Sequence, residues 1–293
     1  MQSSLMSAAC HSFLTNACPH TREPRMSLTS ADHETLGRAL YDAMRAETPI
    51  KPLRETHPSI TIEDAYQISR IMLSHRTKND GEAVVGKKIG VTSAAVQEML
   101  GVFQPDFGFL TDAMAYADNA EIPVAGNMIS PRAEGEIAFR LKSTLTGTEN
   151  TEADVLAATE SIFPCFEIVD SRIENWQIAI QDTIADNASC GVYVLGDAEI
   201  DPNVTDLPNI KIDVKKNGEP LSTGMGSAVQ GNPLTAVAWL ANTLGAYGIA
   251  LEAGEVILSG SVVPLEPVQA GDVMSLVMSG EGFESCSVSC RFV

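Results

Sequence analysis

Basic residues are scarce in this 293-residue chain, which has 19 Lys and Arg against 38 Asp and Glu and a formal net charge of −19. Nucleic acids and anionic membrane surfaces are bound through basic patches, so this composition argues against both kinds of partner. A small anionic ligand would also be repelled by the chain as a whole. Its binding site therefore needs local positive charge, supplied by a metal ion or a lysine.

Long apolar runs are missing as well, and no stretch approaches the roughly 20 residues that span a bilayer. The amino-terminal segment is rich in Ser, Thr and Cys without a continuous apolar run, which disfavours a secretory signal. Arg22 and Arg25 beside a single acid, Glu23, leave a weaker case for an organelle transit peptide. We interpret residues 1–30 as a disordered extension, with Met26 an alternative start, and expect a cytoplasmic protein.

The six cysteines show no spacing typical of a disulfide framework or a zinc site. Cys286 and Cys290 lie in an alternating, strand-like segment, where a rise of ~3.3 Å per residue places the two thiols ~13 Å apart. At that separation they neither share a zinc ion nor form a bridge. Structural cysteines in a reducing compartment are the simplest interpretation.

The amino-terminal third has the patterns of helices. Helices are expected from about Asp32 to Arg45, from Thr61 to about His75, and from Thr92 or Ser93 to Gly101. Thr61 and Asp64 have the spacing of a capping box, with Asp in place of the usual Glu. A short strand bounded by glycines is expected at 84–91, before the third helix.

Strand patterns dominate from about Ile122 onward. The expected strands are 136–142, 165–170, 190–196, 210–216, 255–259, 273–278 and 285–292. Asn217-Gly218 indicates a two-residue hairpin, while Thr151 and Asn232 each indicate the start of a helix. We therefore predict an α+β fold with a helical amino-terminal part at 31–115 and a β-rich catalytic domain at 116–293.

Two glutamates stand at the beginning of one predicted strand, in Pro131-Arg-Ala-Glu-Gly-Glu136. Residues i and i+2 project from the same face of a strand, so the carboxylates of Glu134 and Glu136 can converge on one ion. A hard cation such as Mg²⁺ prefers oxygen ligands of this kind. Such a pair is nevertheless more often solvated surface charge, and by itself it is a weak indication of a metal.

A third glutamate, Glu167, lies in the apolar run Phe163-Pro-Cys-Phe-Glu-Ile-Val-Asp170. A carboxylate in such surroundings needs a partner, because an isolated buried charge is costly. A metal shared with Glu134 and Glu136 is one possibility, and a salt bridge to Arg132 or Arg172 is the other. Asp170, three residues on, should face the opposite way and serve as a structural hydrogen-bond acceptor.

Lys88 and Asp106 are candidates for proton transfer. Lys88 lies between apolar neighbours in the predicted strand at 84–91, where burial would lower its pKa and let it act as an acid or base, or hold an oxyanion. The neighbouring residue types by themselves favour an exposed Lys88 beside Lys87. Asp106 follows a proline, and a plain turn is the default interpretation. The loop at 182–191 can supply amide and hydroxyl groups to a carboxylate, or be an ordinary turn.

Taken together, these segments resemble the 2-hydroxypenta-2,4-dienoate hydratases (2-oxopent-4-enoate hydratases) of aromatic meta-cleavage pathways, within the fumarylacetoacetate hydrolase superfamily. The resemblance extends from about Ile60 to Phe292. Its most specific pieces are Lys88-Ile-Gly-Val-Thr92, Gln104-Pro-Asp-Phe-Gly108, Pro131-Arg-Ala-Glu-Gly-Glu136, Glu167-Ile-Val-Asp-Ser-Arg172 and Ala185-Asp-Asn-Ala-Ser-Cys-Gly191, with Trp176 between the last two. It implies a β-rich body of mixed, rolled sheets after the helical part.

The resemblance also implies a site and a reaction. It implies Mg²⁺ or Mn²⁺ on Glu134, Glu136 and Glu167, Lys88 and Asp106 as the catalytic pair, and Asn187 and Ser189 near the substrate. The implied reaction is ketonisation of a small 2-hydroxy dienoate, followed by addition of water at C4 to give a 4-hydroxy-2-oxo acid. Relatives are homo-oligomers, and association with a pathway decarboxylase or aldolase is a further expectation.

Three other functions are compatible with the sequence. The sister family of 4-oxalocrotonate decarboxylases uses the same metal scaffold and releases a distal carboxylate as carbon dioxide. A carbon–carbon hydrolase of the superfamily would need a histidine paired with an acid, and neither His57 nor His75 lies in a matching motif. A non-catalytic partner subunit is the most distant reading, because the chain retains the three glutamates, Lys88 and Asp106 together.

Overall fold

The computed structural model describes residues 28–93, 97–98 and 101–293. The helix expected between Thr92 and Gly101 lies partly outside the described residues, and almost all of the predicted extension at 1–30 lies outside them.

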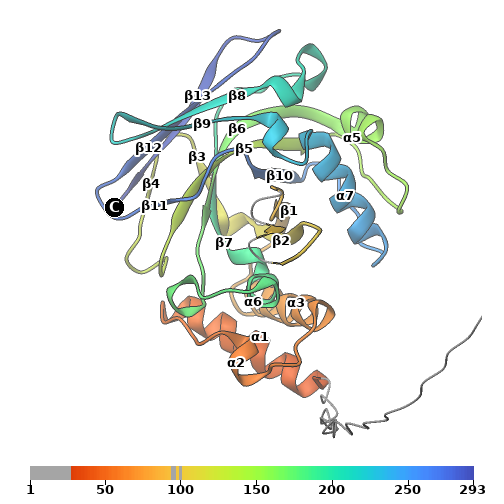
Figure 1. Ribbon diagram of the computed structural model, residues 1–293, viewed down its shortest axis with the longest axis vertical. Helices are drawn as coiled ribbons and strands as arrows, with labels where there is room; N and C mark the ends of the chain where they lie inside the picture. The colour runs from red at the N-terminus through yellow and green to blue at the C-terminus, as the bar shows by residue number, and fades with distance from the viewer. Residues whose placement is uncertain (1–27, 94–96, 99–100) are drawn as a thin grey trace, which may run out of the picture.

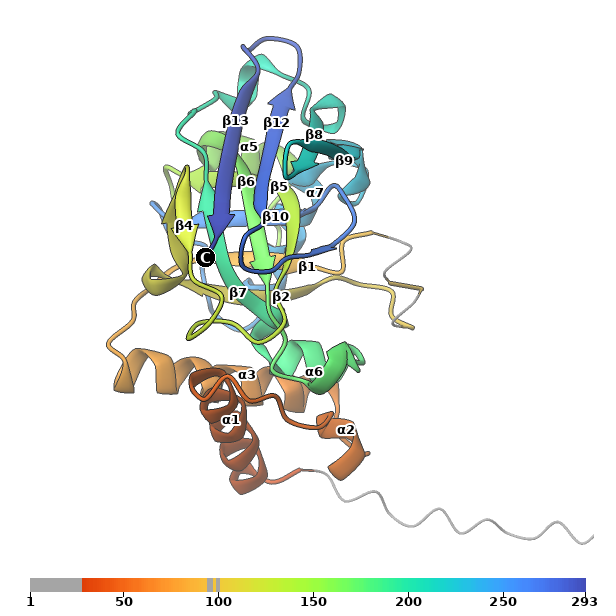
Figure 2. The same ribbon diagram turned by 90° about the vertical axis from the view of Figure 1, so that its left-hand side faces the viewer.

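Three helices precede the first strand, namely α1 (Ser30–Arg45), α2 (Leu53–Thr56) and α3 (Ile62–Asn79). Both α1 and α3 begin with a capping box in which a threonine and the aspartate three residues later exchange hydrogen bonds with each other's backbone. Their apolar faces pack together and against α6 (Ile180–Ala185) in a cluster separate from the main core. Figures 1 and 2 show these helices gathered at one end of the molecule.

The larger of two sheets has the strand order β2-β1-β10-β5-β6-β7-β3, and a short strand, β11, also pairs with β5. Its strands are β1 (Val84–Gly90), β2 (Asp106–Thr111), β3 (Ala115–Ala117), β5 (Arg132–Leu141), β6 (Thr159–Val169), β7 (Cys190–Leu195), β10 (Val256–Ser261) and β11 (Glu266–Pro267). β1 and β10 are parallel, whereas β5 is antiparallel to both β10 and β6. The mixed pairing brings the carboxyl ends of β1 and β10 beside the amino-terminal half of β5.

The smaller sheet has the order β4-β13-β12-β8-β9. Its strands are β4 (Ala120–Ile122), β8 (Lys211–Lys216), β9 (Glu219–Met225), β12 (Val273–Ser279) and β13 (Cys286–Phe292). Asn217 and Gly218, both with positive φ, form the tight turn between β8 and β9, so the predicted hairpin is confirmed. Cys286 and Cys290 are free thiols on β13, as expected.

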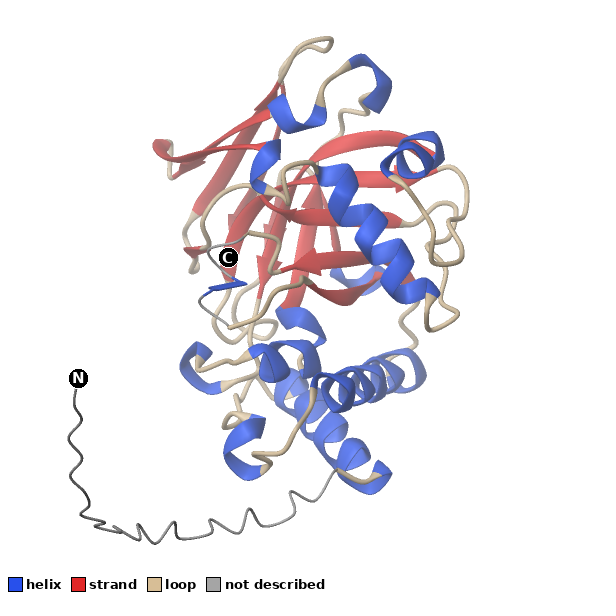
Figure 3. Ribbon diagram, turned by 45° about the vertical axis from the view of Figure 1, so that its right-hand side comes forward, coloured by secondary structure: helices blue, strands red, loops and turns tan. Residues whose placement is uncertain are grey.

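Two further helices accompany the strands, α5 (Glu152–Ala158) and α7 (Pro233–Gly245). The N-cap residues are Thr151, which forms a capping box with Asp154, and Asn232, which precedes a proline at the first helical position. Short 3-10 turns occur at Asp112–Met114, Glu174–Trp176, Asn187–Ser189, Pro202–Val204, Leu207–Asn209 and Gly226–Ala228. Figure 3 shows α7 lying along the strands, apart from the amino-terminal helices.

The two faces of the larger sheet have different roles. Ala133, Ile137 and Phe139 of β5 belong to the main core, which the smaller sheet and α7 share. A Cβ on Gly135 would lie within 3.4 Å of side chains from β8 and β12, so this glycine lets the two sheets approach. The alternate residues of β5 therefore face away from the smaller sheet, and both predicted glutamates of this strand are among them.

The predicted α+β class, with helices before the strands, is confirmed. β1 and β2 come from the segment 31–115 but belong to the larger sheet, so this amino-terminal part contributes strands as well as helices. The domain boundary at 115 itself stays a prediction. No helix among the described residues is long and apolar enough to cross a membrane.

Candidate active site

Three glutamates converge on one face of the larger sheet. Glu134 on β5 lies directly opposite Glu167 on β6, and Glu136 follows two residues along β5 on the same face. One carboxylate oxygen from each residue lies within 4.8 Å of the others. Among the described residues, no other group of acids has this metal-binding geometry. The family resemblance implied this grouping, and the antiparallel pairing of β5 with β6 produces it.

These carboxylates are unfavourably placed in the absence of a cation. Burial raises the pKa of Glu134 to about 8, and the charge of Glu167 adds to the shift. Burial and the charges of the other two glutamates also raise the pKa of Glu136 well above its usual value. Glu136 accepts one hydrogen bond, from the backbone N–H of Gly260 at 2.8 Å, which offsets part of that cost.

A divalent cation fits this donor set. Oε1 of Glu136 and Oε2 of Glu167 are buried without a partner among the described residues, and Oε1 of Glu167 faces the ammonium of Lys88 at 3.3 Å. Unpaired carboxylate oxygens are the ligands that Mg²⁺ and Mn²⁺ prefer, and a bound cation would remove the repulsion among the three acids. The residues present therefore match the implied metal in both chemistry and charge.

Lys88 on β1 is 3% exposed and its Nζ lies 3.3 Å from Oε1 of Glu167. The expectation of an exposed lysine is thus wrong, and so is the expectation of a lowered pKa. Burial alone would favour the neutral amine, but the nearby carboxylates, Glu167 foremost, outweigh it and raise the pKa of Lys88. The neighbouring Lys87 is buried too, and forms an ion pair with Glu255.

Asp106 is 1% exposed at the start of β2, so it is not the residue of a plain surface turn. It pairs with Gly90 at the end of β1, where a Cβ would lie 2.2 Å from Oδ1 of Asp106 and 3.4 Å from Nζ of Lys88. Gly90 therefore leaves the space in which these two charged groups meet. Burial raises the pKa of Asp106 to about 6, although the charge of Lys88 opposes the shift.

Unusual backbone surrounds this space. Val91 follows Gly90 with φ of 57°, a left-handed conformation that β-branched residues rarely adopt. Gly260, which donates to Glu136, has φ of 112°, and a Cβ there would lie 2.5 Å from the side chain of Thr92. Val91 belongs to one of the motifs that carry the resemblance, but no sequence pattern predicted its backbone conformation or the position of Gly260, because close approaches between distant segments leave no periodic signal.

Asn187 and Ser189 lie on a turn in which residues 187, 188 and 189 all have φ between 52° and 54°. The Asn187 side chain accepts a hydrogen bond from the N–H of Phe109 at 2.8 Å and donates one to its carbonyl at 2.9 Å. The Ser189 hydroxyl lies 3.3 Å from that of Thr183. Asn187 therefore clamps the strand that begins at Asp106.

Arg172 and Arg132, the two alternative partners predicted for Glu167, form other contacts. Arg172 is 2% exposed, forms an ion pair with Asp186 and donates to the carbonyls of Asp170 and Cys190. Asp170 accepts from two backbone N–H groups of the loop before β5, which confirms its predicted structural role. Arg132 stacks on the ring of Trp176.

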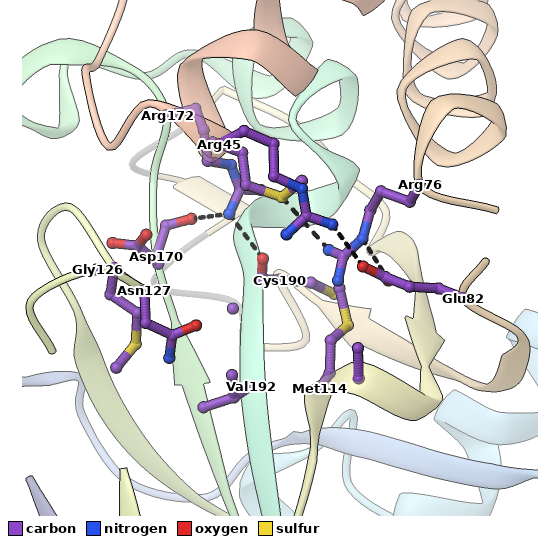
Figure 4. A pocket seen from close by; sticks show the side chains of 14 residues that line it. Arg45, Arg76, Glu82, Met114, Gly126, Asn127, Asp170, Arg172, Cys190 and Val192 are labelled. Atoms are coloured by element: carbon purple, nitrogen blue, oxygen red, sulfur yellow. Dashed lines mark hydrogen bonds and ion pairs between the residues drawn. The ribbon is translucent and has the colours of Figure 1, made fainter. Parts of the chain in front are cut away.

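A cavity of about 210 Å³ lies between the amino-terminal helices and the strands. None of the five predicted metal and catalytic residues lines it. Figure 4 shows Arg45, Arg76 and Arg172 around it. Glu82 accepts from Arg45 at 2.6 Å and from Arg76 at 2.7 Å, Arg45 also pairs with Asp80, and Arg172 pairs with Asp186. The charges at this cavity are thus balanced by their neighbours, which indicates a structural junction.

A sequence model of the family described as "Fumarylacetoacetate (FAA) hydrolase C-terminal" matches residues 83–288. A 2-hydroxyhexa-2,4-dienoate hydratase from Comamonas testosteroni is 58% identical over 256 residues, which cover 87% of this chain and 96% of the relative. A 2-hydroxypent-2,4-dienoate hydratase from Pseudomonas putida is also 58% identical, over 73% of this chain and 96% of the relative.

Among solved structures, 4-oxalocrotonate decarboxylase from Pseudomonas putida G7, complexed with magnesium and adipate, superposes with a TM-score of 0.86. It is 32% identical and covers 91% of this chain and 99% of its own. The higher identity and near-complete coverage of the hydratases agree with the motifs around the three glutamates. This chain therefore belongs to the 2-hydroxypenta-2,4-dienoate hydratase family within the fumarylacetoacetate hydrolase superfamily.

Proposed function

We propose that this chain is a Mg²⁺- or Mn²⁺-dependent hydro-lyase that adds water to 2-hydroxypenta-2,4-dienoate or a close homologue, giving a 4-hydroxy-2-oxo acid in aromatic meta-cleavage catabolism. The observation that carries the proposal is the buried cluster of Glu134, Glu136 and Glu167, with Lys88 and Asp106 beside it. The hydratase relatives, named above, support the choice of reaction.

Glu134, Glu136 and Glu167 would hold the metal through one carboxylate oxygen each. When bound, the cation supplies a Lewis acid that stabilises negative charge on the substrate's 2-oxygen. The burial of Glu136 and Glu167 keeps water away from two of the ligands, which strengthens every electrostatic interaction in the site.

Lys88 and Asp106 divide the proton transfers. The ammonium of Lys88, kept protonated by the surrounding carboxylates, can donate a hydrogen bond to the 2-oxygen or a proton to C5. Asp106, with a pKa raised to about 6, is mainly a carboxylate at neutral pH and can accept a proton from water.

The proposed reaction has two stages. In the first, the dienol loses its hydroxyl proton and gains one at C5, which gives the conjugated 2-oxo-3-enoate. In the second, the hydroxyl of water bonds to C4 while Asp106 takes its proton, and a proton is returned at C3. The sum is the addition of one water molecule to the substrate.

Asn187 and Ser189 take different parts in this proposal. The Asn187 amide bonds to the backbone of Phe109, which supports a role in positioning Asp106 three residues earlier on β2. Ser189 remains the candidate for a hydrogen bond to the substrate, because the one partner of its hydroxyl among the described residues is that of Thr183, at 3.3 Å.

The test combines a metal titration with a hydratase assay on Glu136→Gln. We expect this substitution to abolish Mg²⁺ binding in calorimetry and to lower turnover of 2-hydroxypenta-2,4-dienoate at least about 100-fold, because a ligand to the cation is lost. Glu160→Gln is the matched control, since Glu160 is an exposed acid on β6 and its loss should leave both measurements unchanged. Undiminished activity of Glu136→Gln would refute the site.

A decarboxylase is the second candidate, because the solved structure with a TM-score of 0.86 is a 4-oxalocrotonate decarboxylase. The same Mg²⁺-dependent assay, run on 2-hydroxypenta-2,4-dienoate, its methyl homologue and the dicarboxylate 2-oxohex-3-enedioate, separates the two functions. Water addition to the monocarboxylates supports the hydratase. Carbon dioxide release from the dicarboxylate, without hydration of the other two, would replace it.

A further inference from the structure

Arg132, the first residue of β5, lies on the same face of the larger sheet as the metal-binding glutamates. Side chains alternate along a strand, so Arg132, Glu134 and Glu136 share one face at spacings of ~7 Å. The intervening Ala133 and Gly135 face the smaller sheet, which fixes the assignment of faces. Arg132 is therefore the next side chain in the row that carries two of the proposed metal ligands.

Exposure to solvent increases along this row of side chains toward the amino-terminal end of β5. Glu136 and Glu167 are 0% and 1% exposed, whereas Glu134 and Arg132 are both half-buried. Lys88 and Asp106, the groups proposed to move protons, are also buried. A substrate that enters from this more exposed end passes Arg132 before it reaches the buried residues of the site.

The Arg132 guanidinium is charged but not neutralised by an acid. Among the described residues no carboxylate lies within 4.0 Å of it, and it lies over the ring of Trp176, whose centroid is 4.5 Å from Cζ. Stacking on an aromatic ring restrains a guanidinium while its N–H groups, which lie in its plane, stay available to donate. Lys88, in contrast, is already paired with Glu167.

Trp176 is held in place for this contact by the loop before β5 and by the backbone of its own loop after β6. Its indole Nε1 donates to the carbonyl of Ser130 at 3.0 Å, and its backbone has a left-handed φ of 55°, next to Asn175 at 54°. Asp170 accepts from the N–H of Ser130 at 2.6 Å, which ties the loop before β5 to the loop after β6. Strained backbone that the surroundings enforce is typical of functional positions.

We propose that Arg132, stacked on Trp176, binds the carboxylate of the incoming substrate and so sets its orientation, with the reacting end toward Lys88 and Asp106. This inference rests on the proposed function, in which the substrate is an anionic 2-oxo acid. The chain carries a net charge of −19, and residues 91–105, which connect β1 to β2, contain no Lys or Arg. An uncompensated guanidinium at the opening is thus the local positive charge that such a substrate needs.

The experiment measures steady-state kinetics on 2-hydroxypenta-2,4-dienoate with Arg132→Gln and Arg132→Lys, at several salt concentrations. For Arg132→Gln we expect KM to rise about 10- to 100-fold while kcat changes less than about threefold, because a charge-assisted contact is lost before chemistry. The salt dependence of kcat/KM should also become shallower. Arg132→Lys should recover part of KM, since it keeps the charge without the planar fork.

Arg291→Gln is the matched control, because Arg291 is exposed on β13 of the smaller sheet and its loss changes the net charge equally. We expect its KM and salt dependence to match the wild type. An unchanged KM in Arg132→Gln, or an equal rise in Arg291→Gln, overturns the proposal, and so does a fall in kcat at constant KM.

Two measurements separate this inference from the proposed function. Calorimetry should show that Mg²⁺ binds Arg132→Gln at least as tightly as it binds the wild type, and that the saturated analogue 2-oxopentanoate binds the Mg²⁺-loaded variant about 10- to 100-fold more weakly. Weaker Mg²⁺ binding, or unchanged analogue binding, refutes the role of Arg132. A wild type that binds no Mg²⁺ or hydrates no dienoate refutes the proposed function instead.

Discussion

Two regions of this molecule bury several charged side chains, and they differ in how the charges are balanced. At the arginine-lined cavity, Arg45 pairs with Asp80 and Glu82, Arg76 pairs with Glu82, and Arg172 pairs with Asp186. At the glutamate cluster, three glutamates and Asp106 face one ammonium, that of Lys88. Each arginine at the cavity thus has a carboxylate partner, whereas the glutamate cluster has an excess of negative charge.

The difference distinguishes a structural site from a functional one. Matched buried ions hold segments together, and they need no further partner. Unmatched buried acids with raised pKa values are costly unless something outside the chain completes them, and such groups are enriched at functional sites. The size of a cavity is therefore a poorer guide here than its balance of charge.

The largest expected effect comes from unbalancing the neutral region. Arg172→Met leaves Asp186 buried without its partner, so we expect the free energy of unfolding to fall by about 3–5 kcal/mol in urea denaturation. The double variant Arg172→Met/Asp186→Leu removes both charges and should recover much of that loss. A single variant within about 1 kcal/mol of the wild type would contradict the structural role.

The glutamate cluster should respond to pH in a way that reports its excess charge. Because the folded protein holds the pKa of Glu134 at about 8, above its value of 4.5 in the unfolded chain, the folded state binds that proton more tightly. The metal-free protein should therefore lose stability as pH rises from about 4.5 to 8, on the order of 2–4 kcal/mol.

Thermal unfolding between pH 5 and 8, with and without Mg²⁺, measures this effect. Mg²⁺ should bind more tightly as pH rises, since protons compete for the same oxygens, and should restore the stability lost. Glu134→Gln should flatten the pH dependence of the metal-free protein. A wild type whose metal-free stability rises over this range would refute the description of the cluster.

A smaller effect is expected at the clamp between Asn187 and Phe109. Asn187→Ala leaves the buried N–H and carbonyl of Phe109 unpaired, which should cost about 1–3 kcal/mol. Turnover should fall as well, with Mg²⁺ affinity unchanged, because Asp106 is on the strand that loses its anchor. Asn217→Ala is the control, since Asn217 also has positive φ and binds backbone, but in a hairpin of the other sheet. Unchanged kcat in Asn187→Ala would refute the positioning role.

The smallest effect should follow removal of an exposed ion pair. Arg38 and Asp42 on α1 are paired one helical turn apart, with side chains 60% and 55% exposed. Solvent screens such pairs, so Arg38→Gln should change the unfolding free energy by no more than about 0.5 kcal/mol. A larger loss would show that exposed and buried pairs in this chain differ less than their surroundings indicate.

Local patterns gave correct predictions where the determining contacts are close in sequence. The capping residues Thr61 and Thr151 begin helices, and Asn217 with Gly218 forms a hairpin, because each motif satisfies its own backbone. The glutamates at 134 and 136 share a face because alternation is intrinsic to a strand. The exposed environment expected for Lys88 was wrong, because its burial depends on strands that are distant in the sequence.

The sequence by itself determined which residues of this protein could do chemistry and which family it resembles, since both are read from residue types and short spacings. Only the tertiary structure decided which of these residues meet. The pairing of β5 with β6 set Glu167 opposite Glu134, and the pairing of β1 with β2 set Asp106 beside Lys88. The physical reason is that charges interact through space, so their partners, their burial and their pKa values are fixed by the fold.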